Sequence, residues 1–128
     1  MWLFAFHACG MRMVDVMTLR WKDIDFKNRV IRKVQVKTRN RNTIPLNEPV
    51  FRILDKWKGR NKVFVFDLLP ENFDLNDNEA IYRRRNSWNN TINTSLRAIS
   101  HGLKWKQDLT FHVARHTWSV LALATGAD

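Results

Sequence analysis

The sequence has few of the features that mark secreted or membrane proteins. Its single cysteine, Cys9, excludes a disulfide within the chain and fits a reducing compartment. The apolar opening, residues 1–9, lacks a basic leader and soon meets Arg12 and Asp15, so it is too short and interrupted for a signal peptide or a membrane span. We therefore expect a cytoplasmic protein with no membrane partner.

Acidic residues are also scarce. The 128 residues include 12 Asp plus Glu against 22 Lys plus Arg, which gives a net charge of +10. Because 45% of the residues are hydrophobic, the chain can bury a core and fits one domain. Nucleic acid is the commonest partner of so basic a domain, although charge alone also fits a ribosomal or secreted cationic protein.

Apolar periodicity and turn residues predict an α+β fold, mainly helical, with a small three-stranded antiparallel sheet. The predicted strands are 24–26, 30–36 and 43–46, with a further extended run at 63–66 and a loop at 67–77. The predicted helices are 1–9, 11–19, 48–58, 78–100 and 110–124, with Thr110 as the N-cap of the last one.

Two motifs and a lysine between them point to a specific chemistry. The first motif is Gly10-Met11-Arg12-Met13-Val14-Asp15-Val16-Met17-Thr18-Leu19-Arg20-Trp21, and the second is His112-Val113-Ala114-Arg115-His116-Thr117. Between them, Val36-Lys37-Thr38 precedes a basic turn and Ile44-Pro45-Leu46. This order resembles the tyrosine recombinase (phage integrase) family: a Gly-x-Arg-x-x-Glu/Asp-x-x-x-Leu-x-Trp box, a hairpin lysine, then His-x-x-Arg-His-Thr.

The resemblance covers nearly the whole chain and implies a DNA breaking and rejoining catalytic fold. It implies that residues 1–128 are a partial integrase-type catalytic domain, incomplete at both ends. The implied reaction is site-specific recombination of duplex DNA, in the integration or excision of a mobile element, through a 3′-phosphotyrosine and without metal or cofactor. The full-length protein would act as a tetramer on DNA, in the bacterial cytoplasm at the nucleoid.

The resemblance also implies roles for single residues. Arg12 and Arg115 would bind the scissile phosphate, since guanidinium groups match phosphate geometry bidentately. His112, one helical turn from Arg115, would assist proton transfer or donate a hydrogen bond. Lys37 would be the general acid that protonates the departing 5′-hydroxyl. Asp15 would hold Arg12 in place.

Other interpretations of these residues are open. Lys33 competes with Lys37 as the hairpin lysine, although Lys37 stands directly before the turn, as in the family. His112 and His116 have the i, i+4 spacing of zinc ligands, but Val113 replaces the glutamate of a metalloprotease and no third ligand is evident. We therefore predict no metal site, and expect His116 to be a buried, hydrogen-bonded structural residue.

Several residues outside the motifs are candidates for DNA contact. Arg39 and Arg41 occupy the basic turn, and each is either a solvated turn residue or a ligand of the DNA backbone. Arg83-Arg84-Arg85 cannot all face one way on a helix, so we expect only some of them, Arg83 and Arg84 among them, to face phosphate. Trp105, between two lysines, is a further candidate.

The nucleophile of the family lies after the second motif, whereas the only tyrosine here, Tyr82, lies before it. We expect Tyr82 to lie away from the phosphate, so that this chain does not cleave DNA alone. The competing hypothesis is a non-catalytic DNA-binding remnant of an integrase. A nicking and closing role like that of type IB topoisomerases is a variant of the first hypothesis. Reading the following stretch of the parent gene for a Gly-His box and a tyrosine would separate the two.

Overall fold

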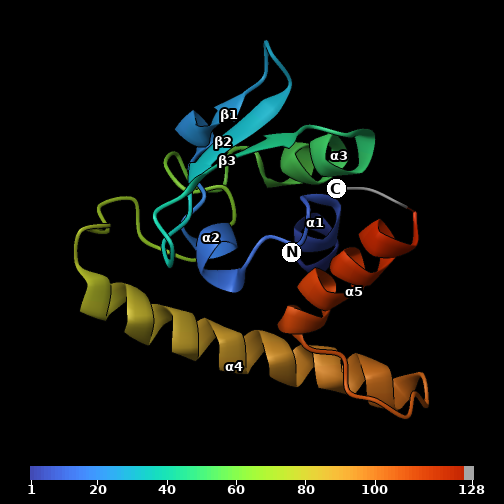
Figure 1. Cartoon of the computed structure of the whole chain (residues 1–128). Helices are drawn as coiled ribbons and strands as arrows, with labels where there is room; N and C mark the ends of the chain where they lie inside the picture. The colour runs from blue at the N-terminus through green and yellow to red at the C-terminus, as the bar shows by residue number, and fades with distance from the viewer. Residues whose placement is uncertain (126–128) are drawn as a thin grey trace.

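The computed structural model describes residues 1–125, and its helices and strands follow the expected α+β order (Figure 1). In chain order they are α1 (Trp2–His7), α2 (Met13–Met17), the 3₁₀ helix η1 (Trp21–Asp23), β1 (Ile24–Asp25), β2 (Val30–Val34), β3 (Arg41–Pro45), α3 (Glu48–Trp57), α4 (Asn78–Gly102) and α5 (Phe111–Ala124). In Figure 1 the sheet and α3 lie on one side, α4 lies on the other, and α1 and α2 lie between them.

The three strands form one antiparallel sheet in the order β1-β2-β3, as predicted. Ile31 of β2 pairs with Ile44 of β3, and both side chains are buried. Strand β2 ends at Val34, two residues earlier than predicted, because Gln35 closes a turn: its N–H donates to the Asn40 carbonyl and its own carbonyl accepts from Arg39. Residue 37 therefore lies in a turn and not in a strand.

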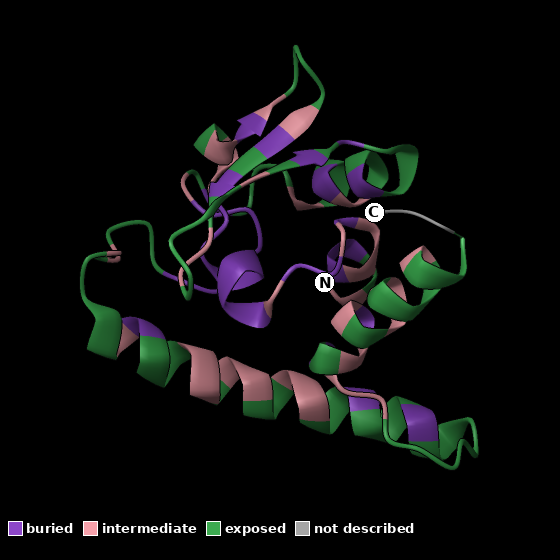
Figure 2. Cartoon of the chain, viewed as in Figure 1, coloured by how far each residue is buried: buried purple, intermediate pink, exposed green. Residues whose placement is uncertain are grey.

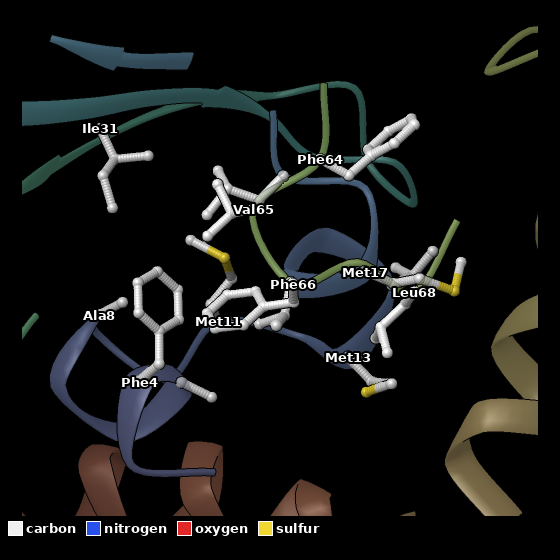
Figure 3. Packing of buried hydrophobic residues seen from close by; sticks show 14 of the residues in the cluster. Phe4, Ala8, Met11, Met13, Met17, Ile31, Phe64, Val65, Phe66 and Leu68 are labelled. Carbon is white, nitrogen blue, oxygen red and sulfur yellow. The ribbon is translucent and has the colours of Figure 1, made fainter. Parts of the chain in front are cut away.

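The core gathers around α1, α2 and the run at 63–66 (Figure 3). Phe4 packs edge-on against Phe66, with 4.8 Å between ring centroids. The predicted strand or extended run is reduced to one antiparallel bridge, Phe64 with Arg20, because the chain turns at Val65 and Phe66. The Val65 N–H donates to the Leu19 carbonyl at 3.0 Å. All five residues of α2 are buried, which Figure 2 shows as a continuous buried segment. The middle of the first motif, Met13–Met17, thus lies on a helix that the core surrounds.

Helix α4 is long and largely polar. It begins where the Asp77 side chain accepts from the Ala80 N–H, and it extends two residues beyond the predicted end, to Gly102. Ile81 and Leu96 are buried on its inner face, and its outer face is exposed (Figure 2). No helix within residues 1–125 combines the length and the apolar character needed to cross a lipid bilayer.

The start of α5 is held by two other helices. The indole N–H of Trp2 donates to the Thr110 carbonyl at 3.0 Å, and Asn93 Oδ1 of α4 accepts from the Phe111 N–H at 2.8 Å. Thr110 occupies the predicted N-cap position, but its side chain makes no capping hydrogen bond. Asn93, a residue distant in sequence, therefore satisfies the first free N–H of α5, whereas Thr110 holds the cap position without a side-chain bond.

Candidate active site

A cavity of about 700 Å³ lies where the start of α2, the turn after β2, α4 and the start of α5 meet. The predicted site residues that line this cavity are Arg12, Lys37, Arg39, His112 and Arg115. The four residues predicted to be catalytic come from three segments that are distant in sequence, and the fold brings them to one cavity.

Arg12 stands at the N-cap position of α2, in extended backbone conformation. Its carbonyl accepts from the Val16 N–H, which fixes the backbone at the first turn of the helix. Its Nη1 atom is buried and has no hydrogen-bond partner within the described residues. A buried donor without a partner is costly, and a phosphate oxygen is a ligand that would satisfy it.

Arg115 packs directly against the turn that precedes Arg12. Its Nη1 donates to the Gly10 carbonyl at 3.0 Å. Gly10 has φ +70°, and a Cβ placed on it would lie 3.0 Å from the Arg115 Cα, so both its conformation and the close approach of α5 require glycine. Burial lowers the pKa of Arg115, the charge of Arg12 lowers it further, and Asp15 opposes both. Two neighbouring guanidinium groups of this kind favour an anion between them.

Asp15 connects α2 to the turn that carries Lys37. Asp15 is 2% exposed, and its Oδ1 accepts from the Val36 N–H at 2.9 Å. Burial raises the pKa of Asp15, while the Val36 hydrogen bond and then the charges of Lys33, Arg12 and Arg115 oppose that rise. The sequence predicted that Asp15 holds Arg12, and that assignment stays a prediction. The structure adds a direct hydrogen bond to the hairpin turn.

The two candidate lysines occupy different environments. Lys37 is exposed in the turn and lines the main cavity. Lys33 is 7% exposed, its Nζ donates to the Val34 carbonyl at 3.3 Å, and it lines a separate cavity of about 30 Å³ with Asp15 and Arg115. Burial lowers the pKa of Lys33, and Asp23 and Asp15 oppose that shift. The placement favours Lys37 as the lysine that meets a ligand, with Lys33 behind the site.

The two histidines of the second motif also differ. His112 lies in the first turn of α5, is exposed and lines the cavity. His116 is exposed and lines no part of it, so the expectation that it is buried is wrong. The buried side of α5 is carried by Phe111 and Ala114, and His116 lies about 200° around the helix from Ala114.

The remaining DNA-contact candidates lie outside the cavity, apart from Arg39. Arg41, Arg84 and Trp105 are exposed and do not line it. Arg83 is also exposed and forms an ion pair with Glu79, 3.6 Å between Nη1 and Oε1. These four stay predictions for a broader DNA surface.

Six residues of α4 that the sequence did not assign to the site line the cavity. They are Asn78, Ile81, Tyr82, Arg85, Asn86 and Asn89. Their spacing of three, four and seven residues places them on one helix face, and that periodicity was the available signal. Tyr82 is exposed and faces the site, so the expectation that it lies away from the phosphate-binding residues is wrong.

The chain belongs to the phage integrase family, whose model matches residues 2–128. Its fold is similar to the crystal structure of XerA recombinase, with a TM-score of 0.65 and 17% identity over 97% of this chain and 42% of that one. It is also similar to the Tn1549 transposon integrase in complex with circular-intermediate DNA, with a TM-score of 0.49 and 22% identity over 98% of this chain and 45% of that one. No curated protein matches.

The family match and the likeness to XerA confirm the recombinase-type α+β fold that the motifs predicted. At these identities, the solved structures establish the fold alone. The chain spans less than half the length of either of them.

Proposed function

We propose that this chain is the phosphate-binding part of a site-specific DNA recombinase that acts by transesterification through a 3′-phosphotyrosine. The observation that carries the proposal is the convergence of Arg12, Lys37, His112 and Arg115 on one cavity. A buried guanidinium nitrogen of Arg12 there has no hydrogen-bond partner among residues 1–125. A site with this much positive charge, and with no acidic lining residue among residues 1–125, suits a phosphodiester.

In the proposed reaction, Arg12 and Arg115 bind the two non-bridging oxygens of the scissile phosphate. The tyrosine hydroxyl gives its proton to His112, its oxygen bonds to phosphorus as the bond to the 5′-oxygen breaks, and Lys37 gives a proton to that leaving oxygen. His112 hydrogen-bonds to the phosphate as its negative charge grows. Removing one preorganised donor of this type costs on the order of 100- to 1,000-fold in rate.

We further propose that the attacking tyrosine comes from outside residues 1–128, and that the complete protein assembles as a tetramer on duplex DNA. The support is the coverage of the XerA structure, of which this chain matches 42%. Tyr82 lines the cavity, so its role needs a direct test. Incubation with a nicked suicide duplex should yield no covalent protein–DNA adduct on a denaturing gel. An adduct that Tyr82→Phe abolishes would identify Tyr82 as the nucleophile and overturn this part of the proposal.

The binding site itself is tested by titrating a labelled DNA duplex at several salt concentrations. Arg12→Gln should weaken binding on the order of tenfold at low salt, because a hydrogen bond to a charged group contributes about 1.5–3 kcal/mol. Lys56→Gln is the control, because Lys56 is exposed on α3, outside the cavity. This substitution removes the same charge as Arg12→Gln does. Equal losses in both variants, or wild-type binding without salt dependence, would contradict the proposed site.

The alternative of a non-catalytic DNA-binding remnant predicts the same binding results. The two differ in the complete parent protein, where the recombinase hypothesis expects an adduct that depends on a downstream tyrosine and on Arg12. A parent protein that binds DNA and forms no adduct would favour the remnant.

A further inference from the structure

The α4 side of the cavity, which includes Tyr82, Arg85, Asn86 and Asn89, contains one arginine. The guanidinium carbon of Arg85 lies 4.8 Å from the centre of the Tyr82 ring, and Arg85 Nη2 donates to Asn86 Oδ1 at 3.0 Å. The stacking holds one face of the guanidinium, and the hydrogen bond holds one of its nitrogens. The side chain is therefore oriented within the cavity before any ligand binds.

Arg85 differs from its two neighbours in the run of three arginines. Arg83 forms an ion pair with Glu79 on the exposed surface, and Arg84 is exposed away from the cavity. Arg85 is half-buried, lines the cavity and forms no salt bridge within residues 1–125. Successive helical residues point about 100° apart, so only one of the three can face the cavity directly.

The cavity is larger than one phosphate requires. Its volume of about 700 Å³ falls within the range of about 300–1,000 Å³ that is typical of sites for ligands with several chemical groups. Arg12, His112 and Arg115 come from the α2 and α5 sides, whereas Arg85 comes from α4. The cavity therefore presents cationic side chains on more than one side, with Arg85 on a different element from Arg12 and Arg115.

We propose that Arg85 binds a second DNA phosphate, next to the scissile one, and that Tyr82 is the positioning residue that orients its guanidinium. This rests on the proposed function, because it takes the scissile phosphate to lie between Arg12 and Arg115. Arg85 would thereby set the register of the strand in the site. The hydrogen bond from Arg85 Nη2 to Asn86 Oδ1 fixes the guanidinium further.

The test compares salt dependence of duplex binding in Arg85→Gln and in a matched control, Arg97→Gln. Arg97 lies on the same helix, is exposed, carries the same charge and does not line the cavity. Each phosphate contact contributes a slope of about −0.9 in log affinity against log salt. Arg85→Gln should therefore lower the magnitude of the slope by about one and weaken binding several-fold at low salt. Arg97→Gln should change the slope by much less.

Variants at Tyr82 separate positioning from direct contact. Tyr82→Phe keeps the ring and should bind as the wild type does. Tyr82→Ala removes the ring, and its slope should move toward that of Arg85→Gln. Arg85→Lys keeps the charge and should keep most of the slope, and it serves as the second variant should Arg85→Gln fail to show a normal thermal melt.

The outcomes distinguish this inference from the proposed function. The proposed function itself is overturned if the wild type binds DNA without salt dependence. It is also overturned if Arg12→Gln binds DNA as tightly as the wild type. Normal salt dependence with a loss in Arg12→Gln, but equal slopes for Arg85→Gln and Arg97→Gln, overturns the role of Arg85 alone. A slope change in Tyr82→Phe as large as in Tyr82→Ala overturns the positioning role and assigns the effect to the hydroxyl.

Discussion

The two sides of the cavity are built differently. The side formed by the segment Gly10–Asp15 and by Arg115 is set in the core, where a glycine, a buried carboxylate and a guanidinium contact one another or the hairpin turn. The α4 side is a single helix face whose cavity residues are held by their own helical neighbours. On the first side, the same residues stabilise the fold and form the binding site. On the second side, the residues that form the binding site contribute little to the stability of the fold.

The largest expected effect tests the side set in the core. Gly10→Ala should destabilise the fold by about 3 kcal/mol, since the new Cβ meets the Arg115 backbone at 3.0 Å and alanine is strained at φ +70°. Gly59→Ala is the control: it has φ +85° but open space, so its loss should be about 1 kcal/mol. Urea denaturation measures both, and equal losses would show that the contact with α5 contributes nothing.

Asp15 gives the next effect. Asp15→Ala leaves the buried Val36 N–H without its acceptor and should cost about 2 kcal/mol in urea unfolding. Asp15→Asn keeps an acceptor oxygen and should recover part of that loss. The prediction concerns the free energy of unfolding and not DNA affinity. A stability loss near zero in Asp15→Ala would contradict the role of Asp15 in connecting α2 to the hairpin turn.

The pH dependence of stability follows from the same carboxylate. Because burial raises the folded pKa of Asp15 above its usual 3.8, the folded state binds the proton more tightly than the unfolded state does. The contribution of Asp15 to stability is then fully present below 3.8 and decreases as pH rises through the folded pKa. Unfolding free energies between pH 3.5 and 7 should show the wild type losing stability relative to Asp15→Asn. The opposite trend would mean that the hydrogen bond and the nearby cations dominate over burial.

Asn93 links the two sides, because it lies on α4 and accepts from the first N–H of α5. Asn93→Ala should cost about 1 kcal/mol, as the loss of a helix cap does. Thr110→Ala should cost only a few tenths, since the Thr110 side chain makes no capping bond. Thermal melts of the two variants decide whether Thr110 or Asn93 of α4 stabilises the start of α5.

The smallest stability effect sharpens the contrast with the α4 side. Arg85→Gln and Lys37→Gln should each leave the unfolding free energy within about 0.5 kcal/mol of the wild type, while both weaken DNA binding. Neither side chain accounts for a buried hydrogen bond of the core. A decrease above about 1 kcal/mol in the unfolding free energy of Arg85→Gln would show that the binding residues of α4 also stabilise the fold.

Sequence patterns predicted the helices and strands to within a few residues, and they predicted which segments carry the catalytic candidates. The errors concern contacts between distant segments. Thr110 is a residue type that caps helices, yet Asn93, seventeen residues upstream, makes the bond. The run of arginines at 83–85 carries no local sign of which member faces inward, because that depends on how α4 packs against α2. His116 and Tyr82 were misplaced for the same reason.

The order of two motifs and a hairpin lysine, with their residue types, was determined by the sequence alone, because each motif is a short continuous stretch of the chain. Which lysine reaches the cavity was decided by the tertiary structure: the turn begins at Gln35, so Lys37 meets the cavity and Lys33 is buried behind Asp15. The rotation of α4 about its axis was decided in the same way, and it brings Arg85 rather than Arg84 to the site. Local patterns record which side chains are present, but only packing between elements sets the phase of a helix and the depth of a side chain.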